Sequence, residues 1–246
     1  MMLEVPVEDG AVVEFECADT WVSRWVCQTI LEDKTYPHLP FIDDVQVVFD
    51  VGSNCGAAAV HFARLHPNAV VHAFEPGSPQ RAILERNAAA YPNITVHPFG
   101  LAAHDALGVP LYQGVGDTIV ASLHQRSDTN TAESEPVDVR AAGPWAASHA
   151  IDRIDIAKVD VEGCEVEVVE SLVDLLPTVK VLYVEYDSRV ARRQIDRLLD
   201  GSHELFYASV MALDQGEGIY VRNDLVDGEA QTAKLVELFR RGLPAP

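Results

Sequence analysis

Short apolar runs alternate with helical patterns along most of the chain. They predict buried strands at 45–51, 69–74, 94–97, 155–161 and 180–186. Runs of this length, closed by Gly, Pro or Asp, are typical of the strands of a parallel sheet. Between these strands and after the last one, the pattern predicts helices at 56–66, 78–91, 164–176 and 187–200. This alternation indicates a Rossmann-like α/β fold, with a mostly parallel sheet and helices on both faces.

The two ends of the chain extend this pattern. Two β-like runs, 203–211 and 218–222, follow without a helix between them. Such a pair predicts antiparallel strands at one edge, which brings the sheet to seven strands. A helical pattern at 20–31 predicts a helix within an N-terminal helical cover, 1–40, on one side of the cleft. An amphipathic pattern at 229–240 predicts a terminal helix.

The stretch 103–148 departs from the alternation. It contains short strand candidates at 109–113 and 119–123 and a polar run at 125–135, and we predict that it is otherwise irregular. An insertion at this place, between the third and fourth parallel strands, is suited to bind an acceptor and to act as a lid. No change in composition marks a second domain, so we expect one domain over 1–246.

The chain is strongly acidic, with a net charge of −20 from 18 Lys and Arg against 38 Asp and Glu. Such a field repels a phosphate backbone unless one face is basic, so nucleic acid is not an expected partner. The densest basic run has the mixed charges of a solvated helix face; it consists of Arg189, Arg192, Arg193, Asp196, Arg197 and Asp200. No apolar stretch approaches the roughly 18 residues that cross a bilayer, and the acidic N-terminus does not resemble a signal peptide. We therefore expect a cytoplasmic protein with no membrane partner.

The four cysteines show no C-x-x-C pair and no zinc-like spacing. They are Cys17, Cys27, Cys55 and Cys164. In a cytoplasmic chain the expected state is free, mostly buried thiols.

A glycine loop lies directly between the first predicted strand and its helix. Gly52 and Gly56 let the backbone approach a ligand closely at the start of that helix. Glu75, at the end of the second strand, is placed to accept the ribose hydroxyls of a nucleoside. This combination fits either a dinucleotide or S-adenosylmethionine. The residues that we predict to bind it are Asp50, Gly52, Ser53, Asn54, Gly56, Glu75, Pro76 and Asp160.

Two details favour S-adenosylmethionine. A dinucleotide fingerprint is G-x-G-x-x-G, whereas Gly52 and Gly56 are separated by Ser, Asn and Cys. A pyrophosphate would also meet the carboxylate of Asp50, which is unfavourable. A sulfonium cation with an α-amino group is instead attracted by Asp50 and Asp160.

Three blocks of the sequence, 49–56, 73–76 and 156–165, resemble the signature blocks of FkbM-type methyltransferases. Segments 84–87 and 121–123 resemble further patches of that family, and the similar region covers roughly Val45 to Glu185. The resemblance implies a class I methyltransferase fold, S-adenosylmethionine as donor, and hydroxyl acceptors on sugars or polyketide-like natural products. The family's leucine–aspartate pair before the fourth strand has no counterpart, because Pro-Trp-Ala-Ala stands there.

Acidic residues gather at the ends of the fourth and fifth predicted strands. Methyl transfer to an alcohol needs a general base, a metal, or both, because the alcohol is a poor nucleophile. We identify Asp160 and Glu185 as catalytic candidates. Together with Asp187 they offer oxygen ligands for Mg²⁺. The alternative is that these acids orient the donor or pair with arginines, without a metal.

Two histidines are candidate bases by position. His124 lies in the insertion, and His149 just precedes the fourth strand. Histidine is the side chain that most readily exchanges a proton near neutral pH.

The sequence therefore predicts an S-adenosylmethionine-dependent O-methyltransferase that acts on a small hydroxylated acceptor. N- or carboxyl-methylation is an alternative that the donor site does not distinguish. A nicotinamide-dependent oxidoreductase and a non-catalytic nucleoside-binding partner subunit are alternatives of other classes. The oligomeric state stays open, and a homodimer is compatible with the sequence.

Overall fold

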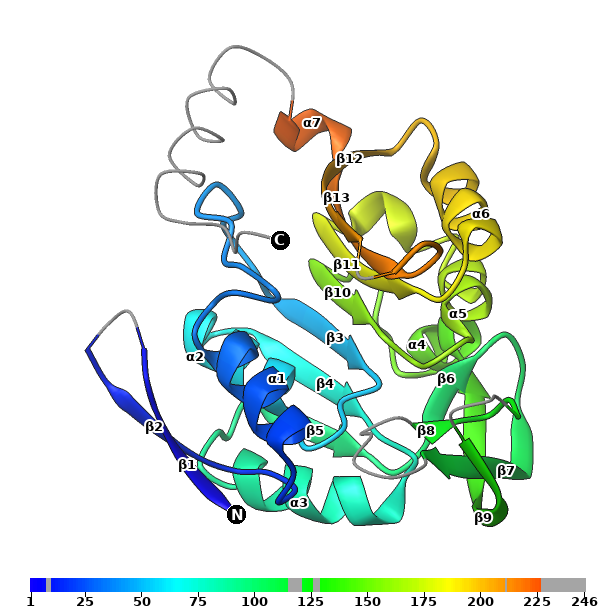
Figure 1. Cartoon of the computed structure of the whole chain (residues 1–246). Helices are drawn as coiled ribbons and strands as arrows, with labels where there is room; N and C mark the ends of the chain where they lie inside the picture. The colour runs from blue at the N-terminus through cyan, green and yellow to red at the C-terminus, as the bar shows by residue number, and fades with distance from the viewer. Residues whose placement is uncertain (8–9, 115–120, 126–128, 211, 227–246) are drawn as a thin grey trace.

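The central sheet of the computed structural model has seven strands in the order β12-β13-β11-β10-β3-β4-β5 (Figure 1). The structure describes residues 1–7, 10–114, 121–125, 129–210 and 212–226, with the backbone alone at 129–133. The strands are β3 (Val47–Val51), β4 (Val70–Phe74), β5 (Ile94–His97), β10 (Ile156–Val159), β11 (Val181–Tyr186), β12 (His203–Val210) and β13 (Gly216–Arg222). Strand β13 is antiparallel to both neighbours, β11 and β12, whereas the pairs from β11 to β5 are parallel. The predicted mostly parallel sheet with an antiparallel edge is thus confirmed.

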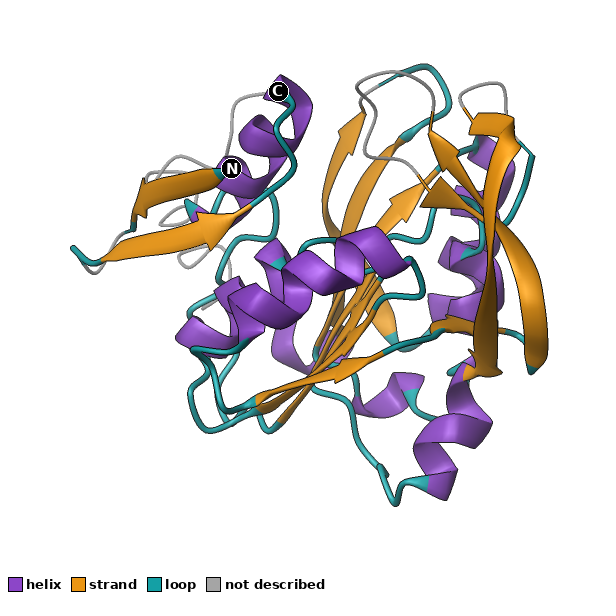
Figure 2. Ribbon diagram, turned by 90° about the horizontal axis from the view of Figure 1, so that it is seen from below, coloured by secondary structure: helices purple, strands orange, loops and turns teal. Residues whose placement is uncertain are grey.

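Alternate residues of the central strands pack against two different layers of helices (Figure 2). Val48 of β3 joins the core with the first three helices, and its neighbour Phe49 joins the core with the next three. Both faces are covered, which explains why these strands are continuous apolar runs. One layer comprises α1 (Trp21–Leu31), α2 (Ala57–Leu65) and α3 (Ser78–Ala88). The other comprises α4 (Ala142–Ser148), α5 (Glu165–Ser171) and α6 (Arg189–Leu199).

The predicted irregular stretch is largely a second sheet, so that prediction was wrong. Its four strands pair in the order β6-β9-β7-β8. They are β6 (Gly100–Ala102), β7 (Ala106–Gly114), β8 (Ala121–Ser122) and β9 (Thr129–Ala141). The polar run hid β9, because the strand pairs along β7 while its described side chains, from Ser134 to Ala141, alternate between a buried and a more exposed face. Part of the candidate strand 119–123 lies outside the described residues.

The N-terminal cover is part helix and part hairpin. Strands β1 (Met2–Pro6) and β2 (Val12–Glu16) pair antiparallel, which corrects the expectation of a purely helical cover. Helix α1 is confirmed, and the Thr20 hydroxyl caps it by accepting a hydrogen bond of 3.1 Å from the Ser23 amide.

Several boundaries differ from the predicted ones. Helix α3 ends at Ala88 and α5 at Ser171, and a short 3-10 helix follows at Leu176–Thr178. A single helical turn, α7 (Asn223–Val226), is the last described element, so the predicted helix at 229–240 lies outside the described residues. Across the part of the chain that the structure describes, no helix combines the length and the apolar character that a membrane span needs.

Candidate functional site

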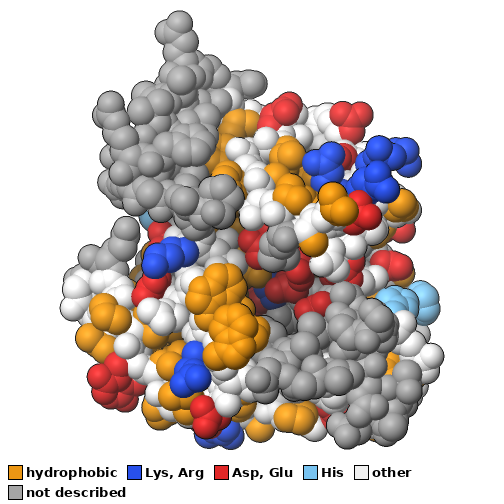
Figure 3. All heavy atoms as spheres, in the orientation of Figure 1, with side chains coloured by type: hydrophobic (Ala, Val, Ile, Leu, Met, Phe, Trp, Pro, Cys, Tyr) orange, Lys and Arg blue, Asp and Glu red, His pale blue; other side chains and the backbone are white. Residues whose placement is uncertain are grey.

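Most of the predicted donor loop lines one cavity of about 460 Å³ at the carboxyl edge of the parallel strands, together with Glu75, Asp160 and Glu185. The predicted residues Asp50, Gly56 and Asp187 are not among its lining residues. Helix α1, β8 of the second sheet and strands β12 and β13 contribute the remaining walls. In the space-filling view, acidic side chains are visible in a hollow near the middle of this face, beside large hydrophobic side chains (Figure 3). Its volume falls in the range of roughly 300–1,000 Å³ that small-molecule sites occupy.

The glycine loop requires two of its residues to be glycine. Gly52 has φ +81°, and a Cβ atom there would collide with the carbonyl oxygen of Asp160. Gly56 has φ +90° at the start of α2, and a Cβ atom there would lie 2.5 Å from a methyl carbon of Leu84. The loop between them, with Ser53 and Asn54, is therefore held close to the end of β10 and forms part of the cavity wall.

Glu75 is fixed with its carboxylate at the cavity. The backbone amide of Gly77 donates to its Oε1 at 2.7 Å, and that of Asn54 donates to its Oε2 at 2.8 Å. Burial raises the pKa of Glu75 to about 7, against the opposing effect of these hydrogen bonds. Each carboxylate oxygen can accept a second hydrogen bond, so this orientation leaves room for two ribose hydroxyls. Pro76, the next residue, also lines the cavity.

The register of the sheet brings the charged residues of the site to one face. Lys158 of β10 lies beside Asp50 of β3, and Glu185 of β11 lies beside Glu217 of β13. Because side chains alternate along a strand, Asp160, two residues beyond Lys158, leaves the sheet on the same side. This is the face covered by α1 and α2, since Val48, Ile156 and their neighbours pack there.

A buried lysine sits between two aspartates. The Nζ atom of Lys158 is 3.5 Å from Asp50 and 3.3 Å from Asp160, and it donates to the Gly52 carbonyl oxygen at 2.6 Å. Burial disfavours its charge, but the two aspartates raise the pKa of Lys158 above its ordinary value. Burial likewise raises the pKa of Asp50, although Lys158 opposes the shift. The ammonium group is thus an internal counter-ion for the donor loop.

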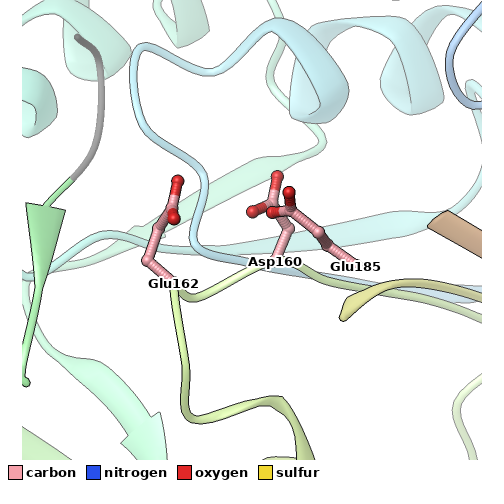
Figure 4. Close-up of side chains that lie close together, drawn as sticks. All are labelled: Asp160, Glu162 and Glu185. Carbon is pink, nitrogen blue, oxygen red and sulfur yellow. The ribbon is translucent and has the colours of Figure 1, made fainter. Parts of the chain in front are cut away.

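Three carboxylates converge beside this lysine. Asp160, Glu162 and Glu185 each offer an oxygen atom within 4.8 Å of the others, and Figure 4 shows Glu162 facing the adjacent pair. Burial and the charge of Asp160 raise the pKa of Glu185 far above its ordinary value. Burial acts against the charge of Asp160 too, but Lys158 and hydrogen bonds from Glu185 and Tyr36 hold its pKa below the ordinary value. Glu185 therefore keeps its proton and donates it in a hydrogen bond to ionised Asp160.

This cluster differs from the predicted metal set at one position. Among the described residues, Glu162 takes the place predicted for Asp187. The charge of Asp187 instead acts on Glu165, whose pKa rises to about 7, mainly through burial. Glu162 reaches the cluster from a loop with φ +58°, a conformation that the residue pattern does not reveal.

The two candidate histidines have different surroundings. His124 is exposed, and its Nε2 atom lies 3.3 Å from the Sγ atom of Cys164, which lines the cavity. His149 is not among the lining residues. It stacks on Trp145 with ring centroids 4.3 Å apart, and its Nδ1 atom is 2.8 Å from the Trp145 carbonyl oxygen. The structure thus places His149 at the C-terminal end of helix α4 and not among the residues that line the cavity.

Three residues of the site were not assigned from the sequence. Tyr36 donates to Asp160 at 3.1 Å from the segment after α1. Glu217 lines the cavity, and burial together with Asp160 raises its pKa to about 7. Neither Tyr36 nor Glu217 lies in a sequence motif that predicts a place in the site. Lys158 does carry a local signal, because a lysine inside an apolar strand between two aspartates needs a buried counter-charge.

Comparison with known proteins places these features in context. The family model described as the methyltransferase FkbM domain matches residues 50–207. A protein of Beauveria bassiana described as "Methyltransferase 1" is 26% identical over 171 residues, which cover 61% of this chain and 68% of that protein.

Solved structures with a similar course of the backbone include two archaeal fibrillarins. The Methanococcus jannaschii pre-rRNA processing protein is 12% identical, with 90% of this chain and 82% of that chain covered and a TM-score of 0.49. The Aeropyrum pernix protein, in complex with S-adenosyl-L-methionine, is 15% identical, with 89% and 94% covered and a TM-score of 0.48. At these values the two structures carry no inference about what this chain binds.

Proposed function

The chain belongs to the family defined by the methyltransferase FkbM domain, and from this premise we propose that it methylates a hydroxyl oxygen of a small metabolite. The family match makes the protein an S-adenosylmethionine-dependent methyltransferase with a class I, Rossmann-like fold. The family match therefore favours a methyltransferase over the alternatives of an oxidoreductase and of a non-catalytic subunit.

The residues at the cavity fit the donor. Glu75 presents a pre-oriented carboxylate to the ribose, and the glycine loop beside it allows close approach. The cavity is lined by five acidic residues against two lysines, Lys34 and Lys158, and Lys158 pairs with Asp160. The excess negative charge attracts the ammonium and sulfonium groups of S-adenosylmethionine. This surplus of acids beside a nucleoside-binding loop is the observation that carries the proposal.

The same acids suit an alcohol acceptor. In the transfer, the acceptor oxygen forms a bond to the methyl carbon, the methyl–sulfur bond breaks, and the hydroxyl proton must pass to a base. Asp160 is ionised and borders the cavity, so it can accept a hydrogen bond from that hydroxyl. Glu217, with a pKa of about 7, has the better-matched affinity for the proton at neutral pH. We propose that Asp160 orients the hydroxyl and that Glu217 takes up its proton.

The residues that line the cavity also restrict the chemical class of acceptor that can bind. Acidic side chains on several walls disfavour a phosphorylated or carboxylated acceptor. Trp25 of α1 lines the cavity and keeps 60% of its surface exposed, so it presents an aromatic face to a ring or an apolar chain. A neutral sugar or polyketide-like alcohol fits these walls.

We propose that methyl transfer proceeds without Mg²⁺. Three converging carboxylates would attract a cation, but the ammonium group of Lys158, 3.3 Å from Asp160, already supplies a positive charge beside them. We expect turnover to survive EDTA and not to rise with added Mg²⁺, while Asp160→Asn weakens binding of the donor. Loss of turnover in EDTA that Mg²⁺ restores would show instead that the acids hold a metal.

The decisive test is transfer of a labelled methyl group. The purified chain is incubated with methyl-labelled S-adenosylmethionine and panels of neutral glycosides, polyketide alcohols, amines and carboxylic acids. We expect labelled methyl ethers from a neutral alcohol, and no product from the Asp160→Asn variant. Labelled amines or esters without any ether would contradict the proposed methylation of a hydroxyl and leave the donor site intact.

A further inference from the structure

Two cysteines from distant parts of the chain meet at the donor site. The Sγ atoms of Cys27, on α1, and Cys55, in the glycine loop, are 3.3 Å apart. Both side chains are buried, with exposed fractions of 3% and 5%, yet both border the cavity. Small reagents that enter the cavity therefore come next to both cysteines.

The separation of the two sulfurs is close to bonding range. A disulfide bond is about 2.05 Å long, so the two sulfurs need to approach by roughly 1.3 Å to form one. The bond would close a long loop, because α1 and the glycine loop are separated in sequence by the segment that leads into β3. Such a crosslink restricts the unfolded chain and is correspondingly stabilising.

The pair is also chemically asymmetric. The hydrogen bond from Cys55 lowers the pKa of Cys27, against the opposing effect of burial. The same contact, together with burial, raises the pKa of Cys55 well above its ordinary value. The thiolate is the nucleophile in thiol oxidation, so Cys27 is the sulfur that attacks and Cys55 the one that resolves.

We propose that Cys27 and Cys55 form a redox-sensitive pair that a peroxide converts into a disulfide between α1 and the glycine loop. The Cys27 thiolate attacks a peroxide oxygen, the O–O bond breaks, and a sulfenic acid and water form once a proton is taken up. The Cys55 sulfur then displaces the sulfenic oxygen, which leaves as a second water. The two thiols together lose two electrons, and these reduce one hydrogen peroxide to two waters.

The crosslink would act on donor exchange, a consequence that rests on the proposed donor site. Cys55 directly follows Asn54, whose backbone amide holds Glu75, and the Cys55 carbonyl oxygen accepts from the Asn87 side chain. Helix α1 forms the facing wall of the cavity. A disulfide fastens this wall to the loop, so S-adenosylhomocysteine should enter and leave the oxidised protein several-fold more slowly.

The test begins with the full wild-type chain. It is treated with hydrogen peroxide, blocked with an alkylating reagent and digested without reductant. We expect one peptide pair, joined through Cys27 and Cys55 and separated again by dithiothreitol. Four alkylated cysteines, a Cys17–Cys27 linkage, or a linkage between two chains would overturn the proposal. Cys17 is the relevant competitor because its thiol also contacts that of Cys27.

Donor exchange is then measured separately on the same samples. Stopped-flow release of S-adenosylhomocysteine should slow in the oxidised wild type and return to the original rate after reduction. The Cys27→Ala variant should not respond to peroxide, whereas Cys164→Ala should respond like the wild type. Equal release rates before and after disulfide formation would refute the control of donor exchange. Failure of the reduced protein to bind S-adenosylhomocysteine would count against the donor site itself.

Discussion

At the level of single residues, Lys158 is more closely involved in the candidate site than either candidate histidine. It lies fully inside the fold and is the charged partner of both Asp50 and Asp160. Buried ion pairs add little when compared with apolar replacements, but removal of one partner leaves an uncompensated charge. The lysine thus supplies a positive charge to both aspartates, although burial keeps the pKa of Asp50 above its ordinary value.

The first prediction concerns this lysine. Lys158→Met should lower the free energy of unfolding by about 3–5 kcal/mol, because Asp50 and Asp160 lose their counter-ion. Urea denaturation at neutral pH measures the change. Lys34→Met is the matched control, because the Lys34 side chain is about half exposed and its ion pair with Glu32 is superficial; its effect should stay below about 1 kcal/mol. Similar losses in the two variants would contradict the role of Lys158.

The second prediction concerns the donor ribose. Glu75→Gln should weaken binding of S-adenosylhomocysteine by roughly 2–3 kcal/mol, or about 30- to 150-fold, because hydrogen bonds to a charged acceptor are lost. Calorimetric titration measures the affinity. Glu85→Gln, on the exposed side of α3, should bind with the wild-type affinity. Wild-type affinity in Glu75→Gln would remove Glu75 from the donor site.

At the level of elements, the second sheet is joined to the acid cluster through one buried hydroxyl. Ser122 of β8 donates to the Glu162 carbonyl oxygen at 2.6 Å and is itself fully buried. Leu111 of β7 and Val139 of β9 line the same cavity. The insertion therefore forms a wall of the cavity, and this placement supports the proposal that the region binds the acceptor.

The third prediction follows from this connection. Ser122→Ala removes a hydrogen bond worth about 0.5–1.5 kcal/mol, so kcat/KM for the acceptor should fall roughly 2- to 12-fold, while the affinity for S-adenosylhomocysteine stays unchanged. Steady-state kinetics and calorimetry separate the two quantities. Ser134→Ala, at an exposed position of β9, should alter neither. An equal loss of donor affinity in Ser122→Ala would show that the hydroxyl supports the whole cavity instead.

Strands that are buried on both faces were predictable from the sequence. Strands whose position depends on the strand with which they pair were not. Strands β3, β10 and β11 are apolar runs because both of their faces are covered. Strand β9 exposes alternate side chains, so its polarity resembled a loop. The insertion of β13 between β11 and β12 is a matter of pairing, which no local pattern encodes.

The same distinction applies to the site. Asp50, Glu75 and Asp160 were predictable because they end parallel strands, and those ends meet at one edge of the sheet. Glu217 was not, because it enters the cavity through the register of an antiparallel pair with β11. Tyr36 was missed because it approaches from a segment without regular structure.

At the scale of the whole molecule, the buried acidic residues affect the free energy of unfolding in a way that depends on pH. The net charge is −20, and several of the acids are buried in or beside the cavity. Burial raises the pKa values of Glu75, Glu165 and Glu217 from 4.5 to about 7. Between those two values these carboxyls bind more protons in the folded chain than in the unfolded chain. By linkage, these three carboxyls lower the free energy of unfolding as the pH rises through this window. Half-buried histidines act in the opposite direction below their ordinary pKa of 6.5, because burial lowers the pKa values of His66, His72 and His97 to about 4.

The last prediction follows from the sign of the carboxyl contribution. Between about pH 6.5 and 7.5, above the ordinary pKa of histidine, the free energy of unfolding should decrease with pH, by up to about 1.4 kcal/mol per pH unit for each of the three carboxyls that is still protonated only in the folded state. Urea denaturation at a series of pH values measures the slope. Glu217→Gln should make the slope shallower because its amide does not titrate, whereas Glu204→Gln, at an exposed position of β12, should keep the wild-type slope. Stability that rises with pH across this range would mean that the three acids ionise as easily in the fold as in the unfolded chain, and the cavity would then lack the low-dielectric character on which the proposed attraction of the donor's cation depends.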